Sequence, residues 1–86
     1  MTRQIRSEID VVLYTRDGCH LCDQAHQLLI QHGLTVKTVD IDQNSNLVDR
    51  YNECVPVVWI DGRERFRGRI NQLLVRRLIA AVERES

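Results

Sequence analysis

Apolar residues along the chain gather into short runs, and the spacing within these runs distinguishes strands from helices. The run from Val11 to Tyr14 is β-branched and aromatic and is followed by Asp17-Gly18, which is typical of a buried strand and a turn. Gly33 is suited to end the next element, a helix from about Cys19 to about His32, in a left-handed conformation. That helix is predicted by an apolar stripe at Leu21, Ala25, Leu28 and Leu29.

The middle of the chain predicts a second strand and a short helix. Residues 35–42, TVKTVDID, alternate in a β-branched pattern that is typical of a strand. A polar stretch follows, in which Asn44 or Ser45 can cap a helix that runs to about Tyr51.

A hairpin comes next. Residues 56–60, PVVWI, predict a third strand, and Asp61-Gly62 predicts a type I′ turn because both central positions of that turn need a positive φ. A fourth, antiparallel strand then covers residues 63–67.

The last element is a helix that ends near Arg84. Asn71 is placed to cap it, and Ile70 can pack back on Val75 as a hydrophobic staple. The core-facing stripe is predicted at Ile70, Leu74, Leu78 and Ala81. The resulting order, β-α-β-α-β-β-α, predicts an α/β domain around a four-stranded mixed sheet, because a right-handed crossover makes the first two strands parallel.

The composition fits one small domain over residues 1–86, with residues 1–8 as a loosely ordered tail. Of the 86 residues, 43% are hydrophobic and 28% charged, and the formal net charge is zero. This balance gives no general attraction to nucleic acid or anionic lipid, and no apolar run approaches the ~20 residues that span a bilayer. The first ten residues lack the apolar core of a secretory signal, so we expect a cytoplasmic protein, and we expect it to be a monomer.

Two of the three cysteines, Cys19 and Cys22, form a C-x-x-C motif at the predicted start of the first helix. There the exposed backbone N–H groups and the positive end of the helix dipole favour a thiolate, which lowers the pKa of the Cys19 thiol. Cys22 lies almost one turn further on and should be more buried, which suits a thiol that resolves a mixed disulfide on Cys19. The motif directly after the first strand of a β-α-β unit therefore favours a redox couple.

Two alternative roles for the cysteine pair remain open. A zinc or iron–sulfur site would need further ligands, which Cys54 with His20, His26 or His32 could supply, but no second closely spaced pair exists. Alternatively, the cysteines are small apolar side chains in a domain that binds partners without catalysis.

Three stretches and their spacing resemble glutaredoxin-like proteins of the thioredoxin fold over about residues 10–80: VVLYTRDGCHLCDQAHQLL, VDID and CVPVVWIDGRERFRG. The resemblance implies a thiol-disulfide oxidoreductase in which Cys19 is the nucleophile and Cys22 the resolving thiol. It also implies that Val55-Pro56 is a cis peptide beside them. Disulfide-containing proteins would be the substrates, no cofactor would be bound, and glutathione or a dithiol would supply electrons.

The chain departs from the usual glutaredoxin pattern around the active pair. His20-Leu21 replaces Pro-Tyr or Pro-Phe between the cysteines, and a protonated His20 would stabilise the neighbouring thiolate. Cys54 replaces the Thr that commonly precedes Val-Pro, and we expect it to be partly buried without a catalytic part.

Contacts to glutathione are expected to be only partly retained. Arg16 stands where glutaredoxins commonly carry a lysine that pairs with a glutathione carboxylate. Arg67-Gly68 replaces a Gly-Gly pair, so Gly68 leaves room for the tripeptide while Arg67 removes some of it, although its guanidinium could itself pair with a carboxylate. The residues expected to bind substrate are thus Arg16, His20, Val55, Pro56, Arg67 and Gly68.

Overall fold

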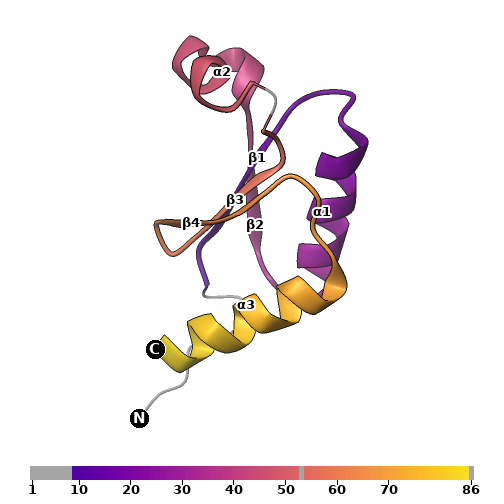
Figure 1. The fold of residues 1–86 in the computed structure, drawn as a ribbon, viewed down its shortest axis with the longest axis vertical. Coiled ribbons are helices and arrows are strands. Elements are labelled where there is room, and N and C mark those ends of the chain that lie inside the picture. Colours follow the sequence, from indigo (N-terminus) through magenta and orange to yellow (C-terminus); the bar gives the residue numbers. More distant parts are fainter. Residues whose placement is uncertain (1–8, 53, 86) are drawn as a thin grey trace.

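The computed structural model describes residues 9–52 and 54–85, so the expected tail over residues 1–8 lies outside the described part (Figure 1). The expected element order is confirmed, with one short 3₁₀ helix added. The elements are β1 (Val11–Thr15), α1 (His20–Gln31), β2 (Val36–Asp40), the 3₁₀ helix η2 (Ile41–Gln43), α2 (Ser45–Tyr51), β3 (Val57–Ile60), β4 (Arg63–Arg67) and α3 (Gln72–Glu85).

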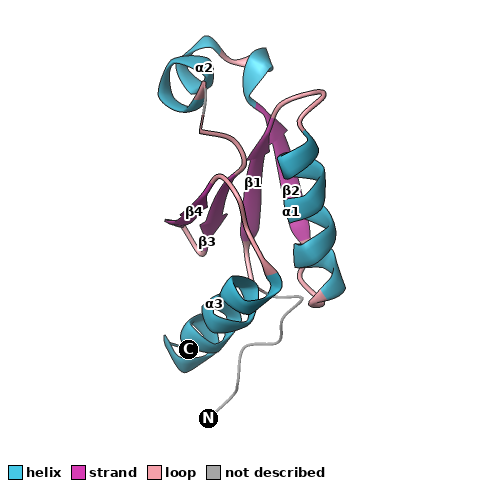
Figure 2. Ribbon diagram, turned by 45° about the vertical axis from the view of Figure 1, so that its right-hand side comes forward, coloured by secondary structure: helices cyan, strands magenta, loops and turns pink. Residues whose placement is uncertain are grey.

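The four strands form one mixed sheet in the order β2-β1-β3-β4 (Figure 2). β1 is parallel to β2 and antiparallel to β3, and β3 is antiparallel to β4. Tyr14 near the end of β1 lies opposite Val57 at the start of β3. The segment that leads into α1 and the segment that leads into β3 therefore meet at the same end of the sheet, where α2 also lies (Figure 1).

Alternation along the strands divides the core between the two faces of the sheet. On one face, Val11 and Leu13 of β1 and Val58 of β3 pack with buried residues of α1 and α3. On the other face, Val57 packs with Ile41 and Tyr51, which come from η2 and α2. Among the described residues, no helix is long and apolar enough to cross a membrane.

Side-chain caps fix the ends of several elements. Oδ1 of Asn44 accepts hydrogen bonds from the N–H groups of Asn46 (2.9 Å) and Leu47 (3.4 Å), so Asn44 is the cap of α2. The second strand is shorter than the pattern predicts, because Oδ1 of Asp40 accepts from the N–H of Asp42 (2.9 Å) and the chain turns into η2. The predicted turn is confirmed, since Asp61 and Gly62 have φ of 50° and 81°.

The last helix is capped as expected but buries a different stripe. Oδ1 of Asn71 accepts from the N–H of Leu74 at 2.9 Å. The fully buried residues are Val75, Ile79 and Val82, whereas Leu74 and Ala81 are only partly buried. Two adjacent stripes of this helix are apolar, and packing against the sheet, which the periodicity does not encode, selects the β-branched one.

Candidate active site

Cys19 is the N-terminal cap of α1. Its φ and ψ are −91° and 106°, and its Sγ accepts a hydrogen bond from the N–H of Cys22 at 3.1 Å. The turn before it is closed by the N–H of Cys19, which donates to the carbonyl of Arg16 at 3.2 Å, and includes Gly18 at φ 75°. The sulfur therefore lies against the amide end of a helix, which is the environment that stabilises a thiolate.

Cys22 is disulfide-bonded to Cys19, and their Cα atoms are 5.2 Å apart. Cys22 is 2% exposed, whereas Cys19 is partly exposed, so the expected difference in burial is confirmed. An attacking molecule can therefore reach Cys19 more readily than Cys22.

The peptide between Val55 and Pro56 is cis, as the resemblance implies, and it joins β3 at the end of the sheet that carries Cys19. The carbonyl of Pro56 accepts a hydrogen bond from the N–H of Gly68 at 2.8 Å. Gly68 has φ of 76°, and a Cβ added there would meet no atom within 4 Å. The backbone beside the cis peptide is thus open on the Gly68 side.

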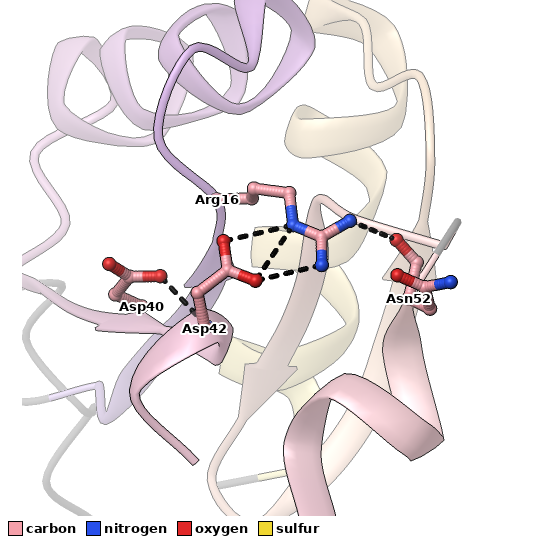
Figure 3. A network of polar contacts seen from close by, with 4 residues as sticks. All are labelled: Arg16, Asp40, Asp42 and Asn52. Carbon is pink, nitrogen blue, oxygen red and sulfur yellow. Dashed lines mark hydrogen bonds and ion pairs between the residues drawn. The ribbon is translucent and has the colours of Figure 1, made fainter. Parts of the chain in front are cut away.

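Arg16 is held within a network of polar contacts (Figure 3). Its Nε lies 3.1 and 3.0 Å from the two carboxylate oxygens of Asp42, and its Nη2 lies 2.8 Å from Oδ1. Nη1 donates to the backbone carbonyl of Asn52 at 2.9 Å. The hydrogen bonds from Arg16 lower the pKa of Asp42, and Asp42 raises the pKa of Arg16. The loop before Cys19 is therefore tied to both η2 and the end of α2.

Arg67 is also paired with a carboxylate. Its Nε and Nη2 lie 2.7 and 3.1 Å from Oε2 and Oε1 of Glu64, and its guanidinium carbon lies 5.7 Å from the centre of the Tyr51 ring. The hydrogen bonds from Arg67 lower the pKa of Glu64, and the same contact raises the pKa of Arg67. Residues three apart on a regular strand point to opposite faces.

A β-bulge brings these two side chains together. Glu64 lies opposite Trp59 and Phe66 lies opposite Val58, so β4 advances by two residues while β3 advances by one. Arg67, opposite Val57, then shares a face with Glu64.

Cys54 and His20 lie at the edges of this arrangement. Cys54 is partly buried, as expected, packs against the cluster around Tyr51, and has its Sγ 3.5 Å from Nη1 of Arg67. His20 is exposed at the first residue of α1. Within residues 9–52 and 54–85, no group of three or more His, Cys, Asp or Glu side chains is arranged to hold a metal ion. Trp59 is partly buried and packs against the cluster that contains Tyr51.

An open hollow of about 370 Å³ borders the start of α1. Its lining comes from the loop before Cys19, the first turns of α1 and the adjoining strand β2, and includes Cys22, Asp23, His26, Thr38 and Asp40. Cys22 thus borders a polar hollow on the side of α1 that faces β2.

Sequence reasoning missed the partners of the two arginines. Asp42 and Asn52 lie far from Arg16 in sequence, and no local periodicity connects them. For Glu64, the i,i+3 spacing to Arg67 was visible, but regular strand geometry would have placed the pair on opposite faces.

A family model and a curated relative indicate the same family, and solved structures share the fold. A family model described as Glutaredoxin-like domain (DUF836) matches residues 10–80. A glutaredoxin-like protein of Dictyostelium discoideum is 30% identical, with 74% of this chain and 68% of that protein covered. The X-ray structure of protein XcR50 from X. campestris is 36% identical with a TM-score of 0.75, covering 83% of this chain and 96% of that one. A buckwheat glutaredoxin, solved in complex with glutathione, is similar in fold alone, with 21% identity and a TM-score of 0.58 over 90% of this chain and 74% of that one.

Proposed function

Because the chain belongs to the family of glutaredoxin-like domains, we propose that it is a thiol-disulfide oxidoreductase that reduces disulfides of protein substrates through Cys19 and Cys22. The observation that carries this proposal is the position of Cys19. Its sulfur caps α1, is partly exposed, and lies within disulfide-bonding reach of a second, buried cysteine.

The reaction begins from the reduced pair. The Cys19 thiolate attacks one sulfur of a substrate disulfide, which forms a mixed disulfide and releases the other substrate sulfur as a thiolate that takes up a proton. The Cys22 thiol then loses its proton and attacks the sulfur of Cys19. This step releases the second substrate thiol and leaves the Cys19–Cys22 disulfide, so two electrons have passed from the pair to the substrate.

The chain's own groups support each step. The N–H of Cys22 donates to the Cys19 sulfur, and this hydrogen bond favours the charged nucleophile. The Cα atoms of the pair are 5.2 Å apart, which lies within the usual range for a disulfide, so resolution needs no large movement of the backbone. The cis Val55-Pro56 peptide borders the same end of the sheet and offers its backbone to an extended substrate segment. A donor with thiol groups, glutathione or a dithiol, then reduces the pair again.

The test uses insulin as a disulfide substrate and dithiothreitol as the reductant. Cys19→Ser should reduce the catalysed rate to the uncatalysed background, because no nucleophile remains. In a second assay without dithiothreitol, Cys22→Ser that has been reduced beforehand should accumulate a mixed disulfide with insulin on Cys19, visible as an added mass that reductant removes.

Two results would contradict the proposal. One is a Cys19→Ser variant that keeps the wild-type rate. The other is a reduced protein that carries one zinc per chain and loses its helical circular dichroism when a chelator removes it, which would favour the metal-binding alternative.

A further inference from the structure

We infer that Asp42 and Glu64 act as internal competitors for carboxylate ligands, so that the active pair is reduced by a dithiol in preference to glutathione. This inference rests on the proposed function and names its electron donor. Glutathione carries two carboxylates. The chain offers one arginine in the loop before Cys19, Arg16, and one opposite the start of β3, Arg67, yet each is already paired with a carboxylate of the chain itself.

Asp42 is the stronger competitor by geometry. Both of its carboxylate oxygens contact Arg16. The backbone carbonyl of Asn52 accepts a hydrogen bond from Nη1 of the same guanidinium (Figure 3). An incoming carboxylate must therefore displace a bidentate partner, or bind to a guanidinium whose charge is already balanced. Asp42 is also covalently part of the chain, so its effective concentration near Arg16 exceeds that of a dissolved ligand.

Glu64 competes with ligand carboxylates for Arg67 in the same way. It meets Arg67 in a two-point contact, and the bulge in β4 fixes the two side chains on one face. The Arg67 guanidinium also lies over the Tyr51 ring and contacts the Cys54 sulfur, so its orientation is determined on several sides. Arg67 and Glu64 are 48% and 32% exposed, close to the 31% and 45% of Arg16 and Asp42, so a dissolved ligand can reach both pairs.

A dithiol does not depend on either cation. Its first thiolate attacks the Cys19–Cys22 disulfide and forms a mixed disulfide with Cys19, which releases the Cys22 thiolate. Its second thiol then closes the donor's own disulfide and releases Cys19, so one molecule supplies both electrons and both protons. Glutathione needs two molecules for the same change, and without carboxylate recognition nothing holds the first in place.

The experiment measures reduction of the oxidised protein by dithiothreitol, by reduced glutathione, and by glutathione diethyl ester, which lacks both carboxylates. Acid quenching and intact mass follow each reaction. In the wild type, glutathione should react no faster than its ester. Asp42→Asn should raise the rate with glutathione about fivefold relative to the ester, as expected for one half-exposed ion pair released to a ligand. Adding Glu64→Gln should raise it on the order of twentyfold in total if the sites are independent.

Two further variants isolate the cause. Asp40→Asn removes one negative charge that acts on Arg16 but keeps the Arg16–Asp42 contact, so the ratio of glutathione to ester should rise far less than with Asp42→Asn. Arg16→Gln added to Asp42→Asn should abolish the gain. A wild type that already prefers glutathione to its ester, or an Asp42→Asn variant with an unchanged ratio, would overturn the inference. Failure of the proposed function would look different, because dithiothreitol-reduced protein would then not reduce insulin.

Discussion

The sulfur of Cys19 caps a helix in addition to its proposed role as a nucleophile, and substitutions can separate these two roles. In the fold, it is the acceptor that caps α1 through the N–H of Cys22. Serine keeps an acceptor at that position, whereas alanine keeps none. We therefore predict that Cys19→Ala is less stable than Cys19→Ser, although both variants lack the proposed nucleophile.

The magnitude follows from the contact that is lost. Removing a side-chain acceptor at a helix N-cap costs about 1 kcal/mol of unfolding free energy. The cost should not reach the upper end of the known range, because Cys19 is partly exposed and water can reach the amide of Cys22. The bond from the N–H of Asp23 to the carbonyl of Cys19, 3.2 Å, is present in both variants. For a domain of this size, about 1 kcal/mol lowers Tm by roughly 4–8 °C.

Thermal unfolding followed by circular dichroism, with reductant present, measures this difference. Neither variant can form the Cys19–Cys22 disulfide, so the comparison is free of its contribution. Asn71→Ala is the matched control, since it removes the cap of α3, whose Oδ1 accepts from Leu74, and should cost a similar amount while leaving insulin reduction intact. Equal Tm values for Cys19→Ser and Cys19→Ala would refute the capping role and, with it, the structural basis for a stabilised Cys19 thiolate.

Two further predictions concern the side chains around the pair. Arg16 lowers the pKa of Asp42, so the stabilisation from this ion pair is present above the ordinary aspartate pKa and is lost as the pH falls through the lowered one. The Tm of the wild type should exceed that of Asp42→Asn near neutral pH and converge with it in acid, and a gap that persists at about pH 2 would count against the pair. Cys54→Thr should leave the insulin reduction rate largely unchanged, and a loss as large as that of Cys19→Ser would show Cys54 to be catalytic.

Local signals in the sequence were sufficient for most of the fold. A compact apolar run, a Gly at a helix end and an Asp-Gly turn each act over a few residues, and the structure shows β1, the end of α1 and the β3–β4 turn where these signals predict them. The errors arose where contacts between elements, and not local sequence, determine which residues are buried and where an element ends. The sheet selects which apolar stripe of α3 is buried, and the carboxylate of Asp40 ends β2 by capping η2.

Some features of the candidate site also follow from local sequence, whereas others depend on contacts between elements. The Cys19–Cys22 pair and its asymmetry of burial follow from position on one helix, so the sequence predicts them. The resemblance supplied the cis Val55-Pro56 peptide, which no local pattern requires. The partners of Arg16 come from elements that are distant in sequence, and the partner of Arg67 is brought to it by a β-bulge. The sequence alone therefore does not show that either arginine is already paired, and both look available to a ligand.

Arg16 has a structural role at this end of the sheet in addition to the ligand-binding role expected from the sequence. Arg16 joins the loop before Cys19 to Asp42 on η2 and to Asn52 at the end of α2, and its own carbonyl accepts the N–H of Cys19 (Figure 3). A ligand that drew the guanidinium away would remove the contacts that tie the loop before Cys19 to η2 and α2. Displacing Asp42 from Arg16 would therefore break the tie between this loop and η2, whereas a donor that contacts only the sulfur leaves it intact. The contact that ties the loop before Cys19 to η2 is thus the same one that, by our inference, competes with the carboxylates of a donor.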